Sequence, residues 1–342
     1  MREHDIGIFH RSAGASSSQV VARIQGGRNR LREYEAALHR FAPQIIIDVI
    51  LSSGEQADQL VDLASVLNAR VVAISSMDIY RARGVMLGTE PGALKPMPIT
   101  EDSRLRTARR AYPPELVQRM KSIFTWVNAE TTKSQSNERS CAAEREAQLS
   151  GCRMVYGPGN PLYRLHVILK RIRDGRPAII LPDDHAAWRG PRGYAENVAH
   201  AIAVASTSER ALRQTYHVCD EPSLTEFDWQ TRSQCRQSGA RNLLCYPVGK
   251  HLSTCSCSEM RRSMCRKFRT DSPGAWLSRP FTIDESIQRT IAWEQANLPT
   301  GPNFHQFDYC GRCGTGRYIA CILITERELV MAPSAASSIL DD

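Results

Sequence analysis

The segment at residues 71–80 reads Val-Val-Ala-Ile-Ser-Ser-Met-Asp-Ile-Tyr, and it indicates the fold more clearly than any other part of the chain. Its apolar half, mostly β-branched, leads into Ser75 and Ser76, and Tyr80 follows four residues later. A short, continuous apolar run of this kind predicts a strand buried in a parallel sheet. Ligands of open α/β sheets bind outside the carboxyl ends of the strands, so these three polar side chains are candidates for a site.

The neighbouring segments repeat an order of strand and helix. Residues 6–11, 20–25 and 44–51 are short apolar runs that predict strands, while residues 30–41 and 57–67 carry apolar side chains at helical spacing. Segments of these lengths in this order predict parallel strands joined by crossover helices. We therefore expect an α/β fold with a doubly wound parallel sheet.

The second half of the chain contains a similar mixture of elements. Residues 163–174, 194–206 and 281–294 have apolar side chains on one face and predict helices, and residues 177–182 predict a strand. Residues 183–188 are polar and are expected to form a loop that could touch a substrate or simply face solvent.

The overall composition is that of a globular protein, with 342 residues, 42% hydrophobic residues and 23% charged residues. No apolar run approaches the roughly 20 residues of a membrane span, and no signal-peptide pattern opens the sequence, so we expect a cytoplasmic protein without a membrane partner. The net charge of +8 fits an arginine-rich solvated surface. The basic segment at residues 261–269 has one aromatic residue and no known binding module, so no specific nucleic acid partner is expected.

The 11 cysteines suggest disulfides or a metal site at first sight. An odd number in a long chain without a secretory signal argues against a disulfide framework. The pairs Cys255-x-Cys257 and Cys310-x-x-Cys313 suggest zinc, but the first spacing is too tight for a usual finger and the pairs lie far apart. We therefore expect no metal, and a basic metal- or nucleic-acid-binding adaptor is the weakest of the alternatives.

Four motifs in order resemble the extended short-chain dehydrogenase/reductase family, the NAD-dependent epimerase/dehydratases. They are Ile74–Tyr80, the Arg-Met-Val-Tyr-Gly-Pro-Gly-Asn of residues 153–160, Gly193–Ile202 and Thr215–Val218. The resemblance spans roughly residues 5 to 230 with gaps. It implies a Rossmann-like sheet followed by a smaller C-terminal α/β substrate domain.

The resemblance also implies a division of the chain and a kind of chemistry. The expected domains are residues 1–150 for NAD(P), residues 151–309 for substrate and an irregular tail at residues 310–342. The expected activity is that of an NAD(P)-dependent epimerase, dehydratase or reductase on a nucleotide sugar or similar hydroxylated small molecule. Such an enzyme passes hydride between a substrate carbon and the nicotinamide, and a homodimer is in keeping with the family.

Site residues follow from the motif positions. Ser76 would hydrogen-bond the reacting oxygen, unless it is a plain strand-end serine. Arg11 would lie near the adenosine ribose, where a basic residue favours the 2′-phosphate of NADP over NAD; an ordinary exposed arginine is the alternative. The resemblance assigns to the cofactor Arg11, Leu51, Ser75, Tyr156, Gly157 and Pro158, and to the substrate Tyr80, Asn160 and Tyr194.

Two signatures of the family are missing. Its first strand and Gly-x-x-Gly-x-x-Gly turn should precede Ile6, where only five residues stand. That loss removes the main anchor for the pyrophosphate and leaves a sheet edge uncovered. The catalytic Tyr-x-x-x-Lys pair is incomplete, because no tyrosine lies between Tyr112 and Tyr156. Lys133 remains as a catalytic candidate, a remnant of the pair or a solvated surface lysine.

These departures leave two interpretations open. The chain either keeps NAD(P) binding and chemistry, or it is a catalytically defective relative or a non-enzymatic binding protein in which cofactor binding is lost. A late start of the chain would also explain the missing turn. Family-like order breaks off at residues 131–150, 231–272 and 310–342. Out-of-frame translation of these segments is a hypothesis that the coding DNA would test.

Overall fold

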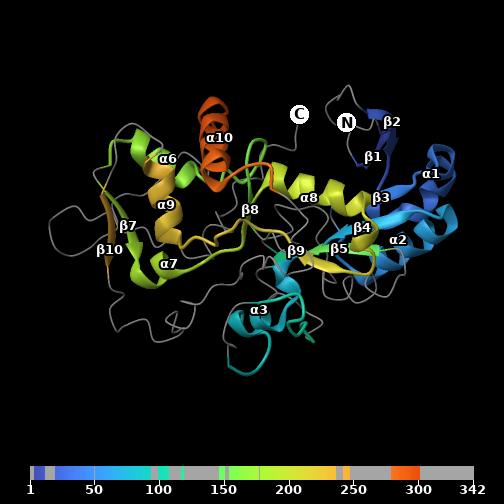
Figure 1. The fold of residues 1–342 in the computed structure, drawn as a ribbon, viewed down its shortest axis with the longest axis horizontal. Helices are drawn as coiled ribbons and strands as arrows, with labels where there is room; N and C mark the ends of the chain where they lie inside the picture. The colour runs from blue at the N-terminus through green and yellow to red at the C-terminus, as the bar shows by residue number, and fades with distance from the viewer. Residues whose placement is uncertain are drawn as a thin grey trace.

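The computed structural model describes residues 4–11, 20–49, 51–93, 99–107, 117–118, 146–150, 154–176, 178–235, 242–246 and 279–300. All pairs of named strands in these ranges are parallel. Figure 1 shows the central sheet with α1 and α2 at the right and most elements of the second half at the left. The expectation of an α/β fold with parallel strands is confirmed.

The central sheet has four strands in the order β3-β4-β5-β9. They are β3 (Ile45–Asp48), β4 (Arg70–Ile74), β5 (Glu146–Ser150) and β9 (Thr215–His217). The strand predicted at residues 71–74 is therefore β4, and it has a hydrogen-bonded neighbour on each side. Because all four strands run the same way, the segments that follow them lie at one edge of the sheet.

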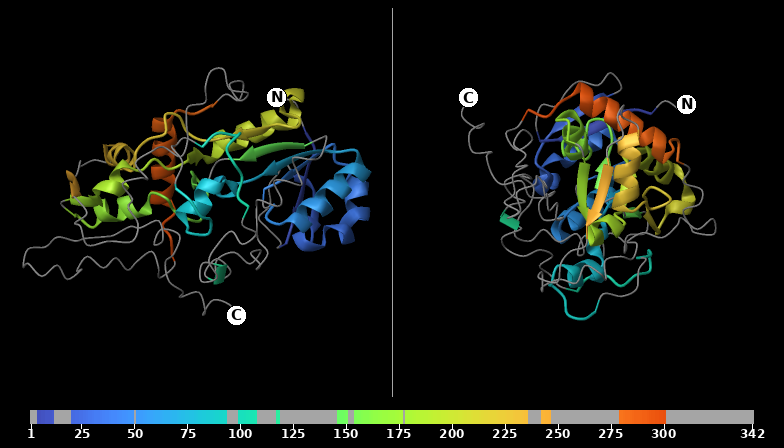
Figure 2. Two further views of the ribbon diagram at one scale, coloured as in Figure 1. Left: turned by 90° about the horizontal axis from the view of Figure 1, so that it is seen from below. Right: turned by 90° about the vertical axis from the view of Figure 1, so that its left-hand side faces the viewer.

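Helices cover both faces of this sheet, as Figure 2 shows with α8 on one side and α2 on the other. Val72 packs in a cluster with Ala201 and Ala205 of α8 (Ala195–Thr207). Val71 and Ala73 pack in another cluster with residues of α2 (Gly54–Leu67). Successive side chains of a strand point to opposite faces, so β4 is buried from both sides and the sheet is doubly wound.

The first two strands form a separate sheet. Among the described strands, β1 (Ile6–His10) and β2 (Val20–Gln25) are hydrogen-bonded only to each other. Aliphatic side chains are exposed on strands of both sheets, with Ile6 at 42% on β1 and Ile47 at 46% on β3. A strand inside a parallel sheet is normally buried on both faces. Among the described strands, β1 and β2 therefore form a sheet separate from the four-stranded one, and each sheet keeps an exposed aliphatic side chain.

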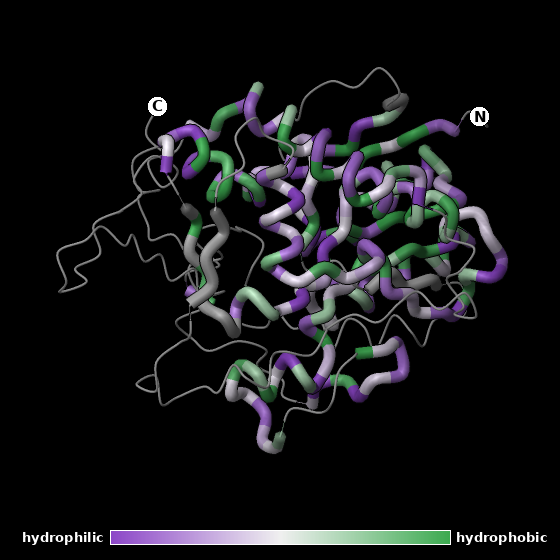
Figure 3. The backbone as a smooth tube through the Cα atoms, turned by 60° about the vertical axis from the view of Figure 1, so that its left-hand side comes forward, coloured by the Kyte–Doolittle hydropathy of each residue, from purple (hydrophilic) through white to green (hydrophobic). Residues whose placement is uncertain are grey.

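The second half of the chain adds two strand pairs and several helices. β6 (Met154–Tyr156) pairs with β8 (Arg192–Tyr194), and β7 (Ala178–Pro182) pairs with β10 (Asn242–Tyr246). The helices α6 (His166–Arg173), α9 (Glu226–Cys235) and α10 (Ile283–Ala296) pack beside them. Figure 3 shows hydrophobic and hydrophilic residues interspersed along the described chain, as expected where one face of each element is buried. Their core contains Tyr156, Leu165, Ile168, Trp229, Ile287 and Ile291.

Several expected elements differ in the structure. Residues 30–41 are not one helix, because η1 (Arg28–Tyr34) is a 3₁₀ helix with a kink at Arg30 and α1 (Glu35–Phe41) follows it. Residues 183–188 are not a loop, since α7 (Asp183–Ala187) is a short helix there. The segments without periodicity contain β5, β10 and the end of α9. Backbone pairing with neighbouring strands and helix packing override weak local patterns in these places.

Helix α10 begins with a complete capping box. Glu285 N–H donates to Thr282 Oγ1 at 3.3 Å, and Thr282 N–H donates to Glu285 Oε2 at 2.8 Å. We expect Thr282→Ala to lower the free energy of unfolding by about 1 kcal/mol in urea denaturation, since it leaves a helical N–H unpaired. The exposed Thr300→Ala is the control and should change stability by less than about 0.5 kcal/mol. Equal effects of the two variants would contradict the role of the cap.

Candidate functional site

Two serines follow β4 at the carboxyl edge of the sheet. Ser76 caps η2 (Met77–Ile79), where Asp78 N–H donates to Ser76 Oγ at 3.3 Å. This leaves the hydroxyl hydrogen of Ser76, which is half-buried, able to donate to another molecule. Ser75 Oγ is buried and has no hydrogen-bond partner among the described residues. The Ser76 hydroxyl can therefore meet a ligand at this edge, and the Ser75 hydroxyl lies unpartnered beneath it among the described residues.

A tyrosine–histidine pair joins the segment after β4 to the end of β9. Tyr80, between η2 and α3 (Arg81–Met86), has its hydroxyl 2.6 Å from Nε2 of His217, the last residue of β9. The rings meet edge to face at 5.3 Å, and both residues are buried. His217 N–H donates to Glu101 Oε1 at 3.0 Å. Burial lowers the pKa of His217, so the imidazole is neutral at neutral pH and shares one hydrogen bond with the phenol.

His217 was not among the residues predicted from sequence. Its partner Tyr80 lies 137 residues earlier, and no local pattern connects the two. A signal did exist, because His217 ends a predicted strand, as Ser75 and Ser76 do. Applying the strand-end rule to every strand would have found it.

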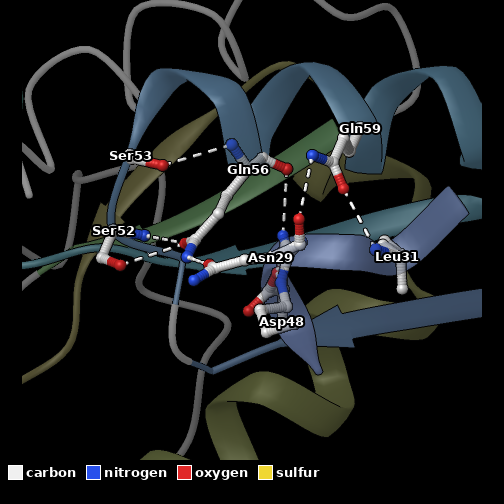
Figure 4. A network of polar contacts seen from close by, with 8 residues as sticks. Asn29, Leu31, Asp48, Ser52, Ser53, Gln56 and Gln59 are labelled. Atoms are coloured by element: carbon white, nitrogen blue, oxygen red, sulfur yellow. Dashed lines mark hydrogen bonds and ion pairs between the residues drawn. The ribbon is translucent and has the colours of Figure 1, made fainter. Parts of the chain in front are cut away.

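A second polar network lies at the carboxyl end of β3, as Figure 4 shows. Arg28 Nε donates to Asp48 Oδ2 at 2.7 Å, and Gln56 Nε2 donates to Asn29 Oδ1 at 2.7 Å. Ser52 donates to Gln56 Oε1 from both its N–H and its hydroxyl. These hydrogen bonds connect η1 to the first turn of α2. Leu51, which directly precedes Ser52, is 3% exposed. The network holds the β3 end of the sheet edge in place.

Tyr156 and Tyr194 are brought together by pairing of β6 with β8, where they occupy the same register. Their ring centroids are 5.7 Å apart. Burial and then the nearby Asp220 raise the pKa of Tyr156 far above its usual value. Burial and the hydrogen bond from Tyr194 to Glu196, at 2.6 Å, raise the pKa of Tyr194 to about 12. Neither phenol is ionised at neutral pH, so neither replaces the missing catalytic tyrosine as a base.

Three of the predicted site residues, Gly157, Pro158 and Asn160, lie in the loop after β6. Gly157 has a φ of +138°, and a Cβ there would lie 3.1 Å from the ring of Tyr194, so only glycine fits. Pro158 is exposed. The Asn160 amide donates to Val155 O, and its Oδ1 accepts from Leu162 N–H at 2.8 Å. The side chain of Asn160 is therefore used within the loop, and its role toward a substrate stays a prediction.

The other predicted residues lie apart from this cluster. Arg11 is exposed and directly follows β1, where its carbonyl accepts from Gln25 Nε2 at 3.2 Å. Lys133 and the paired cysteines lie outside the described residues. Within the described ranges no three potential metal ligands gather, and no helix is long and apolar enough to cross a membrane. Cys219, beside β9, is disulfide-bonded, which the cysteine pattern did not indicate.

The described residues fit a dinucleotide in part. Arg11, Leu51 and Ser75 directly follow or lie just beyond β1, β3 and β4, and the unpartnered hydroxyl of Ser75 could take a hydrogen bond from a ribose or amide. The described residues offer no comparable hydrogen-bonding site for the pyrophosphate of a dinucleotide. The printed sequence contains no Gly-x-x-Gly-x-x-Gly turn, and the described strands β1 and β2 form a sheet separate from the four-stranded one.

Comparisons with known proteins show what the fold is. No known protein family and no curated protein sequence matches the chain. Among solved structures, dTDP-4-dehydrorhamnose reductase from Bacillus anthracis in complex with NADP is similar, with a TM-score of 0.53 and 13% identity over 84% of this chain and 98% of that one.

Two further structures show the same likeness. MoeE5 in complex with UDP-glucose and NAD has a TM-score of 0.53 and 14% identity, covering 86% of this chain and 92% of that one. Epimerase Mth375 from Methanothermobacter thermautotrophicus has a TM-score of 0.55 and 10% identity, covering 83% and 80%. At these identities the likeness establishes the fold: the chain has the architecture of NAD(P)-dependent epimerases and reductases, as its motifs predicted.

Proposed function

We propose that the chain binds a nicotinamide dinucleotide at the carboxyl edge of its sheet, with NADP favoured over NAD. We further propose that it acts on a hydroxyl or carbonyl carbon of a nucleotide sugar or similar hydroxylated small molecule. The observation that carries this proposal is the group formed by Ser75, Ser76 and the Tyr80–His217 pair at the ends of β4 and β9. The fold supports it, because similar structures hold NADP or NAD.

The chemistry assigned to this chain is hydrogen bonding and positioning. A bound nicotinamide would give or take the hydride. Ser76 would donate its hydroxyl hydrogen to the substrate oxygen, since its Oγ already accepts from Asp78 N–H. A donor aimed at the reacting oxygen stabilises the charge that develops there during hydride transfer. The buried Tyr80–His217 pair joins the turn that carries Ser76 to the end of β9 and so positions the serine.

A second candidate function is that of a defective relative or a non-enzymatic binding protein. The separation of β1 and β2 from the four-stranded sheet, among the described residues, favours it. The lack of a Tyr-x-x-x-Lys pair in the sequence favours it as well. This candidate predicts a folded chain with substrate binding but no turnover. A homodimer stays a prediction for light scattering.

A turnover assay separates the two candidates. The purified chain is incubated with NADPH and a panel of oxo and hydroxylated nucleotide sugars, and loss of reduced nicotinamide and change in the sugar are followed. We expect turnover of at least one sugar and a kcat about 10²–10³-fold lower in Ser76→Ala, because one hydrogen bond to the reacting oxygen is lost. Ser65→Ala on the exposed side of α2 should leave kcat unchanged. Equal activity of both variants would remove Ser76 from the mechanism.

A further inference from the structure

Cys219 stands two residues after the end of β9 and is disulfide-bonded. The residue is 6% exposed, so the bond is shielded from most of the solvent. On one side of it, the Nε2 atom of His217 lies 2.6 Å from the Tyr80 hydroxyl. On the other side, Asp220 N–H donates to Arg192 O at 2.7 Å. The disulfide therefore lies between two residues that hold the end of β9 to other parts of the chain.

The pairing of β5 with β9 indicates which cysteine is the partner of Cys219. The two strands are parallel, and their register ends with Ser150 opposite His217. Two positions further along each segment, the sequence has Cys152 and Cys219. Cys152 lies outside the described residues, and continuing the register by two positions sets it opposite Cys219. The strand register therefore favours Cys152 as the partner.

The spacing of neighbouring strands suits such a bond. Neighbouring strands lie about 4.8 Å apart, and the two Cα atoms of a disulfide are usually about 4.4–6.8 Å apart. Opposed side chains of paired strands also point to the same face of the sheet. Two other cysteines, Cys235 and Cys245, belong to α9 and β10, which Figure 1 draws at the left and well apart from β9. The described strands thus bring Cys152, and not these two, toward Cys219.

We propose that Cys152 and Cys219 form a disulfide that links the ends of β5 and β9 and makes this edge of the sheet sensitive to redox state. Two molecules of a thiol such as glutathione reduce the S–S bond to two cysteine thiols. They give up two electrons and two protons and become glutathione disulfide. Without the cross-link, His217 is held less firmly beside Tyr80. This inference needs no dinucleotide, so it goes beyond the proposed function.

Peptide mapping tests the pairing. The full chain is equilibrated in a glutathione buffer in which the oxidised form predominates. It is then unfolded in the presence of N-ethylmaleimide, digested without reductant and analysed by mass spectrometry. We expect a linked pair of peptides that contain Cys152 and Cys219 and that reduction separates. A Cys219 that carries N-ethylmaleimide in the sample that was never reduced, or that is linked to another cysteine, would overturn the proposal.

Hydrogen–deuterium exchange measured by mass spectrometry tests the effect on the sheet edge. The N–H of His217 is protected by its bond to Glu101 Oε1. We expect peptides that cover residues 215–220 to exchange about tenfold faster in Cys152→Ser or after reduction, because the local opening becomes easier. Peptides that cover β3 should exchange as before, and the control Cys321→Ser should change neither.

Two results would count against the redox sensitivity. One is unchanged exchange over residues 215–220 in both Cys152→Ser and the reduced chain. The other is faster exchange of the same size in Cys321→Ser, because the effect would then not depend on the proposed pair. If Cys152→Ser fails to fold, the oxidised and reduced forms of the unmodified chain decide the question.

Discussion

Arg192→Met is expected to lower the free energy of unfolding by about 3–5 kcal/mol, because it leaves a buried carboxylate without its cation. Arg192 and Glu226 are 6% and 7% exposed and form an ion pair. Burial alone would raise the pKa of Glu226, but Arg192 beside it lowers the pKa below its usual value. Because methionine fills a volume similar to that of arginine, the lower free energy of unfolding reports the loss of the positive charge. The measurement is urea denaturation at neutral pH.

A surface ion pair on α9, the helix that carries Glu226, is the matched control. Arg232 of α9 pairs with Asp284 at 3.1 Å, and their side chains are 42% and 44% exposed. Arg232→Met should cost about 1 kcal/mol or less, since water screens the pair. The Arg192–Glu226 contribution should also fade in acid, because a lowered pKa stabilises the fold only above the unfolded value and is lost as the pH falls. Similar losses for Arg192→Met and Arg232→Met would contradict the burial of Arg192.

Glu294→Gln is expected to stabilise the protein by about 3 kcal/mol at about pH 8, with no gain at about pH 4. Glu294 of α10 is 2% exposed, and its Oε1 accepts from Leu165 N–H at 3.1 Å. Burial raises its pKa to about 7. The folded chain therefore binds this proton more tightly than the unfolded chain. The resulting stability is complete below the unfolded pKa and is lost as the pH rises toward 7.

Glutamine keeps the acceptor for Leu165 N–H but has no carboxyl proton to lose. The variant therefore avoids the loss of stability that deprotonation of the buried Glu294 causes as the pH rises. Thermal unfolding followed across the pH range measures the difference. The exposed Glu285 on the same helix is the control, because hydrogen bonds from Thr282 lower its pKa. Glu285→Gln should therefore bring no gain in alkaline solution. A Glu294→Gln effect that does not change with pH would show that Glu294 is not buried against the start of α6.

Local patterns in the sequence were enough to predict β4 and the two serines after it. Val71 to Ile74 are apolar in an unbroken run, and burial from both faces is what such a run favours.

Other features depend on contacts between distant segments and left no local signal. Strand β5 reads Glu-Ala-Gln-Leu-Ser, and it pairs with β4 and β9 although its sequence resembles no buried strand. The Tyr80–His217 bond and the Arg192–Glu226 pair join residues 137 and 34 positions apart. Such pairs become visible only when the chain has folded. The strand within residues 131–150 also shows that weak periodicity alone does not identify a segment as foreign to the fold.

The most direct test of the central claim is a fluorescence titration of the full chain with NADPH and with NADH. Circular dichroism of the same sample first establishes that the chain is folded. The proposed function predicts saturable binding of NADPH, tighter than that of NADH, and loss of this preference in Arg11→Ala because the 2′-phosphate loses its cation. No binding of either nucleotide up to millimolar concentration, in a folded chain, would contradict the claim. The fold would then be that of a dinucleotide enzyme without its activity.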